Sequence, residues 1–283
     1  MGRSLIVNAD DLGWSVEVNA GIIKAYTQGV VTSCTLMATM PGAADAVGRL
    51  RDCPDLGVGV HLTLTSGEPV SADRSVRRVL AGGGNFPTSL LGLLWHARTS
   101  KRWRQAAEAE LGAQIEWMLQ QGLHPDHLDS HKHIHVVDPF PEMVARLAQR
   151  YRIRCIRNTC ERPRVRIGTV GPTARLRRRL LHHWGHRAGK VFEKAGLIQP
   201  ETFFGIEDTG RPNIERVRTF FETCAAGTVE WMVHPGNRES PPSAPTRLVE
   251  SRWLEKKMLT EAELAVIIAR CGFRLVRYKE LSQ

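Results

Sequence analysis

The sequence predicts an α/β fold in which parallel strands form a sheet or a barrel. Short apolar runs alternate with stretches of helical periodicity along the 283 residues, and this alternation is typical of repeated strand–helix units. Aspartate or histidine stands at the end of four of the runs. In a barrel the active site is assembled at that end of several strands, so the pattern also points to an enzyme. The length fits one domain spanning residues 1–283.

The predicted elements follow in this order along the chain. Apolar runs predict strands at 5–7, 31–37, 56–62, 127–131, 155–157, 230–234 and 274–276. Helical periodicity predicts helices at 17–28, from Pro41, at 101–121, at 141–150 and over most of 246–271. Residues 64–90, which contain three consecutive glycines, are predicted to be a loop-rich stretch.

Composition narrows the class of protein. The chain is 42% hydrophobic and 24% charged, which is typical of a globular protein. No stretch approaches the roughly 20 apolar residues of a transmembrane helix, and the run Leu5–Val7 is too short for a signal peptide. Six cysteines without a CxxC pair are typical of reduced thiols, so we expect a cytoplasmic protein.

Asp10 and Asp11 follow the first apolar run directly. Adjacent side chains of an extended chain point in opposite directions, so a turn at the strand end is needed to bring both to one pocket. One carboxylate can then bind a metal ion while the other accepts a proton from water. The structural alternative is that one of them caps the helix predicted at 17–28.

His61 ends the run at 56–62, where a lone histidine is more often structural. Together with Asp11 it can supply two of the three protein ligands that are typical of a catalytic zinc site. We therefore expect one more ligand elsewhere in the chain, with a divalent ion such as zinc or magnesium as the cofactor.

Residues 124–135 hold five histidines and two aspartates. Histidine is the commonest metal ligand, whereas the structural alternative is a polar loop. His131, His133 and His135 share one face if this segment is extended. We expect one of them to be a ligand and its neighbours to orient ligands or bind substrate.

Two further side chains stand at later strand ends. His234, in Met-Val-His-Pro-Gly, can donate a proton to a leaving group, or it is a loop histidine fixed by the proline and glycine that follow. Arg157 can hold an anionic or oxyanionic group of a substrate, or it forms a structural salt bridge.

At these residues the sequence resembles the YdjC-like carbohydrate deacetylases, the group that includes chitooligosaccharide deacetylase (ChbG). The resemblance is carried, in the expected order, by Asn8-Ala-Asp-Asp-Leu-Gly13, His61-Leu-Thr-Leu-Thr-Ser-Gly67, Asp129-Ser-His-Lys-His-Ile-His135, Val233-His-Pro-Gly236 and a closing stretch at 251–260. Within the group the sequence is most similar to the hopanoid-biosynthesis-associated (HpnK) branch.

The resemblance implies a deformed, TIM-like (β/α) barrel and metal-dependent removal of an N-acetyl group from an amino sugar. It implies Asp11, His61 and His131 as metal ligands and Asp10 as the catalytic base. His234 is the implied acid, and His133 and Arg157 are assigned to the substrate. The hopanoid branch implies an N-acetylglucosaminyl hopanoid lipid as substrate, and soluble chitooligosaccharides are the alternative.

The basic segment 162–190 holds nine Arg or Lys and no acidic residue, against a net charge of +10 for the whole chain. We expect a helical insert at about 162–195. Its leucines and Trp184 fall near helical spacing, which favours peripheral contact with an anionic membrane, at the inner face if the protein is cytoplasmic. A solvated helix packed by its leucines is equally compatible, while nucleic acid is disfavoured because no known nucleic-acid-binding fold is recognised.

Two other functions are compatible with the same residues. A phosphoesterase or nuclease can use the same metal site, with the basic segment 162–190 holding phosphates. A catalytically silent lipid-binding protein is disfavoured, because a binder needs no open metal site spread over four strand ends.

Overall fold

The computed structural model describes residues 2–161, 171–225, 227–238 and 246–282. Its strands form one eight-stranded sheet in the order β5-β4-β3-β2-β1-β7-β6, with β8 also paired to β1, and every pairing is parallel. The strands are β1 (Arg3–Leu12), β2 (Ser33–Leu36), β3 (Gly57–Leu62), β4 (His127–Ser130), β5 (Cys155–Ile156), β6 (Thr202–Phe204), β7 (Thr228–Val233) and β8 (Phe273–Leu275).

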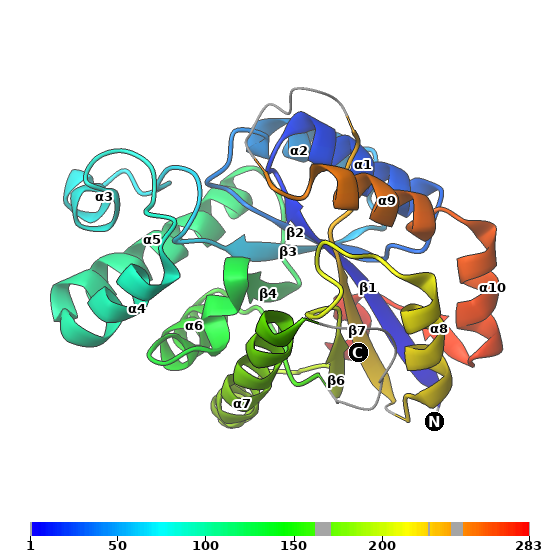
Figure 1. Ribbon diagram of the computed structural model, residues 1–283. Coiled ribbons are helices and arrows are strands. Elements are labelled where there is room, and N and C mark those ends of the chain that lie inside the picture. The colour runs from blue at the N-terminus through cyan, green and yellow to red at the C-terminus, as the bar shows by residue number, and fades with distance from the viewer. Residues whose placement is uncertain (1, 162–170, 226, 239–245, 283) are drawn as a thin grey trace.

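The sheet curls, and its two ends approach each other. Two parallel bridges join them: Cys155 of β5 pairs with Ile198, ahead of β6, and Glu161, after β5, pairs with Phe203 of β6. The strands lie in the middle of the molecule with the helices around them (Figure 1). This arrangement confirms the predicted deformed (β/α) barrel.

The helices form the outer layer. They are α1 (Val16–Thr27), α2 (Ala43–Leu50), α3 (Arg74–Ala81), α4 (Leu90–Thr99), α5 (Lys101–Gln120), α6 (Phe140–Arg150), α7 (Pro172–Lys194), α8 (Ile214–Thr223), α9 (Val249–Leu259) and α10 (Ala262–Arg270). Short 3-10 segments lie at η1 (His131–Val136) and η2 (Tyr278–Ser282).

The sequence prediction was wrong for part of the stretch 64–90. It contains α3, which begins after Asp73, whose side chain accepts a hydrogen bond from the amide of Ser75. Gly82 ends α3 with a φ of 63°, so this glycine stops a helix rather than marking only a loop. Helices α4 and α8 and strand β6 were not predicted, and Pro41 lies two residues before α2 rather than at its start.

The pleat of the strands sorts polar from apolar side chains. Along β1, Leu5, Val7 and Ala9 join the main core beneath the helices. Ile6 faces the barrel interior, where it packs with Tyr278. Because side chains alternate along a strand, the inward side of β1 continues from Ile6 to Asn8 and Asp10.

The same alternation places the other inward residues. On β4, Leu128 packs in the outer core, while Asp129 bonds to partners in the interior. On β7, Trp231 and Val233 join the outer core, while Glu230 contacts interior groups. The interior is therefore apolar at its base and polar toward the carboxyl ends of the strands.

Helix α7 covers the part of the basic segment that the structure describes, since residues 162–170 lie outside the described residues. Its buried side is formed by Leu181, Gly185, Ala188 and Phe192, and it packs against α6 and η1. Of the leucines expected to pack this helix, Leu181 lies on the buried side, whereas Leu176 and Leu180 are exposed.

Helix α1 approaches the loop after β7 very closely at Gly21. A methyl group there would lie 2.3 Å from the Cα of Gly236 and 2.8 Å from the backbone nitrogen of Asn237. We expect Gly21→Ala to destabilise the protein by about 2 kcal/mol in chemical denaturation, because the loop must move.

Gly48 in α2 is the matched control, because an added methyl group there meets no atom within 4 Å. Gly48→Ala is expected to stabilise the protein by about 0.5–1 kcal/mol, as in an ordinary helix interior. Equal effects of the two substitutions would contradict the proposed contact between α1 and the loop.

Glu161 is a buried carboxyl group with incomplete hydrogen bonding. Its Oε1 accepts a hydrogen bond from the amide of Gly205 at 3.0 Å, and its Oε2 has no partner among the described residues. Burial, with Asp208 and Glu207 nearby, raises the pKa of Glu161 to about 8 from an ordinary value of 4.5. Between these two pH values the folded chain holds a proton that the unfolded chain has released, so stability falls as pH rises.

We therefore expect Glu161→Gln to stabilise the protein above pH 8 by about 1–3 kcal/mol and to have little effect near pH 4.5. Urea denaturation at acidic, neutral and alkaline pH measures this difference. Glu222→Gln, at an exposed position of α8, serves as the control and should not show this pH-dependent gain. A gain for Glu161→Gln that does not vary with pH would contradict the assignment.

Candidate active site

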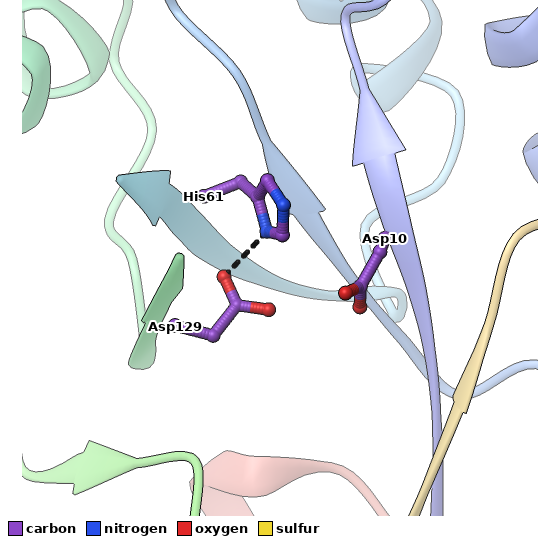
Figure 2. A group of neighbouring side chains, drawn as sticks. All are labelled: Asp10, His61 and Asp129. Atoms are coloured by element: carbon purple, nitrogen blue, oxygen red, sulfur yellow. Dashed lines mark hydrogen bonds and ion pairs between the residues drawn. The ribbon is translucent and has the colours of Figure 1, made fainter. Parts of the chain in front are cut away.

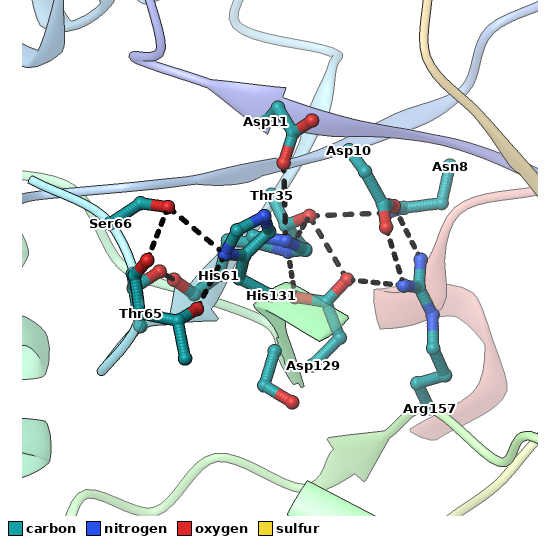
Figure 3. A network of polar contacts seen from close by, with 12 residues as sticks. Asn8, Asp10, Asp11, Thr35, His61, Thr65, Ser66, Asp129, His131 and Arg157 are labelled. Carbon is teal, nitrogen blue, oxygen red and sulfur yellow. Dashed lines mark hydrogen bonds and ion pairs between the residues drawn. The ribbon is translucent and has the colours of Figure 1, made fainter. Parts of the chain in front are cut away.

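Arg157 is buried and pairs with several carboxylates of a polar network, of which Figure 3 shows Asp10 and Asp129. Its guanidinium forms a two-pronged pair with Asp10, at 2.6 and 2.7 Å. It also contacts Asp129 Oδ2 at 2.8 Å and Glu230 Oε1 through both Nε and Nη2. These contacts engage all three nitrogens of the guanidinium. Arg157 was expected either to hold an anionic group of the substrate or to form a structural salt bridge, and its contacts are those of a salt bridge.

Asp10 lines a cavity, and its carboxylate accepts hydrogen bonds from neighbouring side chains of the protein interior. Besides Arg157, Asn8 donates a hydrogen bond to Asp10 Oδ1 at 3.0 Å. Burial opposes ionisation of Asp10, but the Arg157 guanidinium outweighs it, so the net pKa of Asp10 lies well below its usual range. Asp10 is therefore ionised and fixed in orientation at neutral pH.

Asp11 reaches the same side of the sheet as Asp10 because β1 is irregular there. The pairing of β1 with β2 shifts between Ala9 and Leu12, and Asp11 has a φ of 69°. The cap of α1 is Ser15, whose side chain accepts from the amide of Val18, so neither aspartate caps that helix.

The two oxygens of Asp11 have different surroundings. Asp11 Oδ2 is paired with Arg252 of α9. Asp11 Oδ1 is buried without a hydrogen bond among the described residues and lies 3.4 Å from His61 Nε2. Burial opposes ionisation, but Arg252 together with the nearby histidines gives a net lowering of the Asp11 pKa.

His61 is oriented through its other ring nitrogen. His61 Nδ1 lies 2.8 Å from Asp129 Oδ1 and 3.1 Å from Thr35 Oγ1. Thr35 in turn donates to Asp129 Oδ2 at 3.0 Å. Burial opposes protonation, but Asp129 outweighs it and the pKa of His61 rises to about 9. A carboxylate behind one ring nitrogen commonly orients a metal-binding histidine so that the other nitrogen faces the ion.

The histidine-rich segment is not extended as predicted. β4 ends at Ser130 and a 3-10 segment follows, with Lys132 at φ 57° and His133 at φ 56°. The condition under which His131, His133 and His135 would share one face is therefore not met, because this left-handed step breaks the alternation.

Two histidines of the 124–135 segment, His131 and His133, line the cavity. His135 is buried beside Ser130, and His127 stacks on Tyr278 at a ring distance of 3.8 Å. His127 and His135 are therefore fixed in the protein interior by packing and hydrogen bonds.

His131 stands next to His61, with ring centroids 6.0 Å apart. His131 Nδ1 lies 2.8 Å from Thr65 Oγ1, which leaves Nε2 for another partner. Burial lowers the pKa of His131 to about 3, so its imidazole is neutral at physiological pH. A neutral imidazole with one ring nitrogen engaged is the form in which histidine binds metals.

The charges of the site leave room for a cation. In this network the four buried carboxylates of Asp10, Asp11, Asp129 and Glu230 are accompanied by the guanidinium groups of Arg157 and Arg252 and by His61, whose raised pKa keeps it protonated at neutral pH. A divalent ion that replaced the His61 proton would balance the negative charge that remains.

One buried cluster has ligand atoms close enough to hold a metal ion. Among the described residues, atoms of Asp10, His61 and Asp129 lie within 4.8 Å of one another (Figure 2). In this cluster, however, Arg157 pairs with both carboxylates and His61 uses Nδ1 for Asp129. An ion held by all three would have to displace these contacts.

The neighbouring group of Asp11, His61 and His131 fits a metal ion better in its chemistry. Asp11 Oδ1 accepts no hydrogen bond among the described residues, and its contact with His61 Nε2, at 3.4 Å, is an ion pair. Two ligands that bind one tetrahedral zinc ion at about 2.0–2.1 Å lie about 3.3 Å apart, which matches this separation. The residues present therefore suit a divalent ion between Asp11 and His61; the His131 ring lies beside His61, but the ligand atoms of these three residues do not all lie within 4.8 Å of one another.

His234 reaches the cavity from the end of β7. Its amide donates to Glu255 Oε2 of α9 at 2.9 Å, and its Nδ1 is buried without a hydrogen bond among the described residues. Burial lowers the pKa of His234 despite the nearby aspartates. Helix α9 thus supports the site twice, through Arg252 at Asp11 and through Glu255 at His234.

The cavity has a volume of about 610 Å³, and its walls are of two kinds. Its polar base includes Asp10, Asp11, His61, His131, His133 and His234. Its apolar wall is formed by Leu90, Leu91, Leu94, Val137, Leu176, Leu180, Leu181, Trp184, Met232 and Leu248. Reactive groups therefore lie at one end of a largely apolar space.

Several site residues were not singled out from the sequence. Asp129, Thr35 and Glu230 are inward-facing residues of predicted strands, so the pleat of each strand was the available signal. The contact of Arg252 with Asp11 joins residues 241 positions apart, and no local pattern indicates it.

In the described part of the chain, none of the helices combines the length and the apolar character needed to span a bilayer.

Comparison with known proteins identifies a family. Residues 4–270 match the model of the family described as YdjC-like protein. A carbohydrate deacetylase of Geobacillus stearothermophilus is 34% identical over 281 residues, covering 99% of this chain and 98% of that protein. A carbohydrate deacetylase of Brevibacillus brevis is also 34% identical, over 98% of this chain and 99% of that protein.

Two further matches extend these comparisons. A chitooligosaccharide deacetylase of Proteus mirabilis is 29% identical over 99% of this chain and 100% of that protein. The crystal structure of a candidate cellobiose-phosphate cleavage protein of Enterococcus faecalis superposes with a TM-score of 0.77, at 23% identity and 99% coverage of both chains. The structural match supports the fold.

Proposed function

The chain belongs to the YdjC-like family, and from this premise we propose that it is a metal-dependent carbohydrate N-deacetylase that removes the acetyl group from an N-acetylated amino sugar. Relatives of about 34% identity over nearly the full length are named carbohydrate deacetylases. The observation that carries the proposal is the convergence of Asp10, Asp11, His61, His131 and His234 at the base of one cavity.

Asp10 is proposed as the base that takes the proton of the attacking water. Arg157 keeps its carboxylate ionised and aimed, while Asp10 still borders the cavity. A base with so low a pKa is always available but intrinsically weak, so it needs a water that is already acidified. We assign Arg157 to holding Asp10 rather than to contact with the substrate.

Asp11, His61 and His131 are proposed to hold a divalent ion, zinc or magnesium. When bound, such an ion would polarise the amide carbonyl and lower the pKa of water. A water of lowered pKa can be deprotonated by a base as weak as Asp10. Asp129 orients His61, Arg252 holds the second oxygen of Asp11, and Thr65 engages His131 Nδ1.

His234 is proposed as the proton donor to the leaving amine. Burial lowers the pKa of His234, which makes its protonated ring a better proton donor than an exposed imidazole. His133, whose Nδ1 is buried without a hydrogen bond among the described residues, is proposed to bind the sugar.

The substrate is proposed to be an N-acetylglucosaminyl hopanoid lipid. The apolar wall of the cavity supports this choice, because a free sugar needs mostly polar contacts whereas a lipid-linked sugar presents an apolar part next to its head group. A lipid substrate also requires contact with the membrane, which we place at the inner face and at the basic segment 162–190. The six free cysteines agree with a cytoplasmic location. Soluble chitooligosaccharides are the second candidate, favoured by the name of the Proteus mirabilis relative.

Acetate release tests the proposal. We expect purified protein supplied with zinc to release acetate from N-acetylglucosaminyl lipid in detergent, and we expect a chelator to abolish the release. N,N′-Diacetylchitobiose, called chitobiose below, serves as the matched soluble substrate. Acetate from chitobiose alone would replace the lipid by soluble sugars. Failure with both substrates, together with release of phosphate from phosphate esters, would replace the deacetylase by a phosphoesterase.

A further inference from the structure

Two helices border the apolar wall of the cavity, and each also presents apolar side chains to solvent. On α4, Leu91 is 82% exposed and Trp95 is 68% exposed. On α7, Leu176 is 57% exposed and Leu180 is 40% exposed. Residues four apart lie on the same side of a helix, so each pair forms one apolar strip. We call these four residues the docking face.

The docking face is continuous with the cavity, since Leu91, Leu176 and Leu180 also line it. The other exposed large apolar side chains of the described residues lie singly on separate elements, with exposures between 37% and 46%; they are Val16, Leu119, Leu254, Val266 and Leu275. Single exposed apolar residues are ordinary, whereas a grouped set beside a cavity marks an interaction surface.

Much of the positive charge of the chain lies in two separate segments that include these helices, although Arg77, Arg98 and Arg178 pair with acidic residues of other segments. Residues 74–107 and 172–190, which include α4 and most of α7, contain 13 Lys or Arg and no Asp or Glu. The whole chain contains 39 basic and 29 acidic residues, so the remainder carries 26 and 29. These two segments therefore carry more than the entire net positive charge of the chain.

We propose that the docking face binds the surface of an anionic lipid bilayer and places the mouth of the cavity against it. Leucine and tryptophan suit the boundary between head groups and acyl chains, and flanking Lys and Arg attract anionic lipids. An anionic bilayer is favoured over a second copy of this chain as the partner, because a symmetric dimer through this face would bring two positively charged regions together. The proposed membrane contact thus includes α4 as well as α7 of the basic segment. Both helices are needed because α7 alone borders the cavity on one side only.

The docking proposal rests on the proposed function only for what enters the cavity. A lipid held in the bilayer would pass its head group along the apolar wall toward Asp10, with its acyl or polycyclic part still beside Leu91 and Leu176. Binding of the membrane itself requires no turnover and can be measured without substrate.

Co-sedimentation with vesicles tests the docking face. We expect the protein to bind phosphatidylcholine vesicles that contain about one third phosphatidylglycerol, to bind pure phosphatidylcholine weakly, and to be released by added salt. Trp95→Ser is expected to weaken binding at least about fivefold, because the largest exposed apolar group is lost, whereas Trp95→Phe should retain it. Leu176→Ser should weaken binding in the same direction.

Leu254→Ser is the matched control, since Leu254 is 42% exposed on α9 and lies outside the docking face. Equal losses in Leu254→Ser and Trp95→Ser, or no binding to the anionic vesicles, would overturn the proposal. A concentration-dependent dimer that Trp95→Ser abolishes would overturn it in favour of a second copy.

Acetate release from soluble chitobiose separates the two proposals. If Trp95→Ser loses vesicle binding but matches the native protein on chitobiose, docking is supported as a role apart from catalysis. If the native protein binds vesicles but releases acetate from no substrate, docking stands and the deacetylase proposal fails. If it releases acetate but binds no anionic vesicles, docking fails.

Discussion

Asp10→Asn is expected to lower kcat for acetate release by about a thousandfold while leaving the metal content unchanged, since general-base catalysis contributes about 10²–10⁴ in rate. The asparagine keeps the shape of the side chain but cannot accept the proton of water. Steady-state acetate release, with metal content measured by mass spectrometry, is the test. A variant that keeps more than a tenth of the native kcat would contradict the assignment of Asp10 as base.

Loss of a carboxylate beside Arg157 has a structural cost that must be separated from the loss of the base. Glu230→Gln is the matched control, because Glu230 is equally buried and contacts the same guanidinium but does not line the cavity. Both variants are expected to lose about 3 kcal/mol of stability, as for a broken buried ion pair. We expect kcat to fall less than about tenfold in Glu230→Gln, since the base remains. Equal losses of kcat would show that Arg157, rather than a base at Asp10, controls the rate.

Removal of the metal is the second large effect. We expect a chelator to abolish acetate release, and added zinc to restore it. Asp11→Asn and His131→Gln are each expected to lose the bound ion on desalting and to lower kcat/KM by about a thousandfold or more, because each removes one of three protein ligands. Metal content per protein molecule is measured in parallel with activity.

Asp129→Asn distinguishes the two possible arrangements of ligands. If Asp129 only orients His61, this variant should retain the ion with an affinity about 10–100-fold weaker. If the ion is instead held by Asp10, His61 and Asp129, then Asp129→Asn should lose it while His131→Gln retains it. The second result would overturn the ligand set proposed here and assign the buried cluster of Figure 2 to the metal.

Most strands and most helices could be predicted from the sequence because their signals are local, whereas β6 was missed. An apolar run ending in Asp10, or in His61, indicates a strand that delivers a polar group to the end of a sheet, and both side chains reach the same cavity. Helix α3 was missed although Asp73 and Gly82 mark its ends, because the glycines beside Gly82 were interpreted as a loop.

The supporting contacts could not be predicted because they join distant segments. Arg252 meets Asp11, and Glu255 meets the amide of His234, only after α9 has folded over the end of the barrel. Likewise, the choice among the clustered histidines depends on the left-handed step at Lys132 and His133, which turns neighbouring side chains in different directions. Spacing along the chain does not indicate such a step.

The left-handed backbone at Asp11 has a consequence for anyone who transplants this site into another barrel. Two adjacent residues of a regular strand serve opposite faces, so copying the Asp-Asp pair onto an ordinary strand would deliver one carboxylate to the interior and lose the other among the helices. The graft must include the register shift between Ala9 and Leu12. It must also keep a residue that tolerates a φ of 69°, for which asparagine is the natural conformational substitute and a β-branched residue is not.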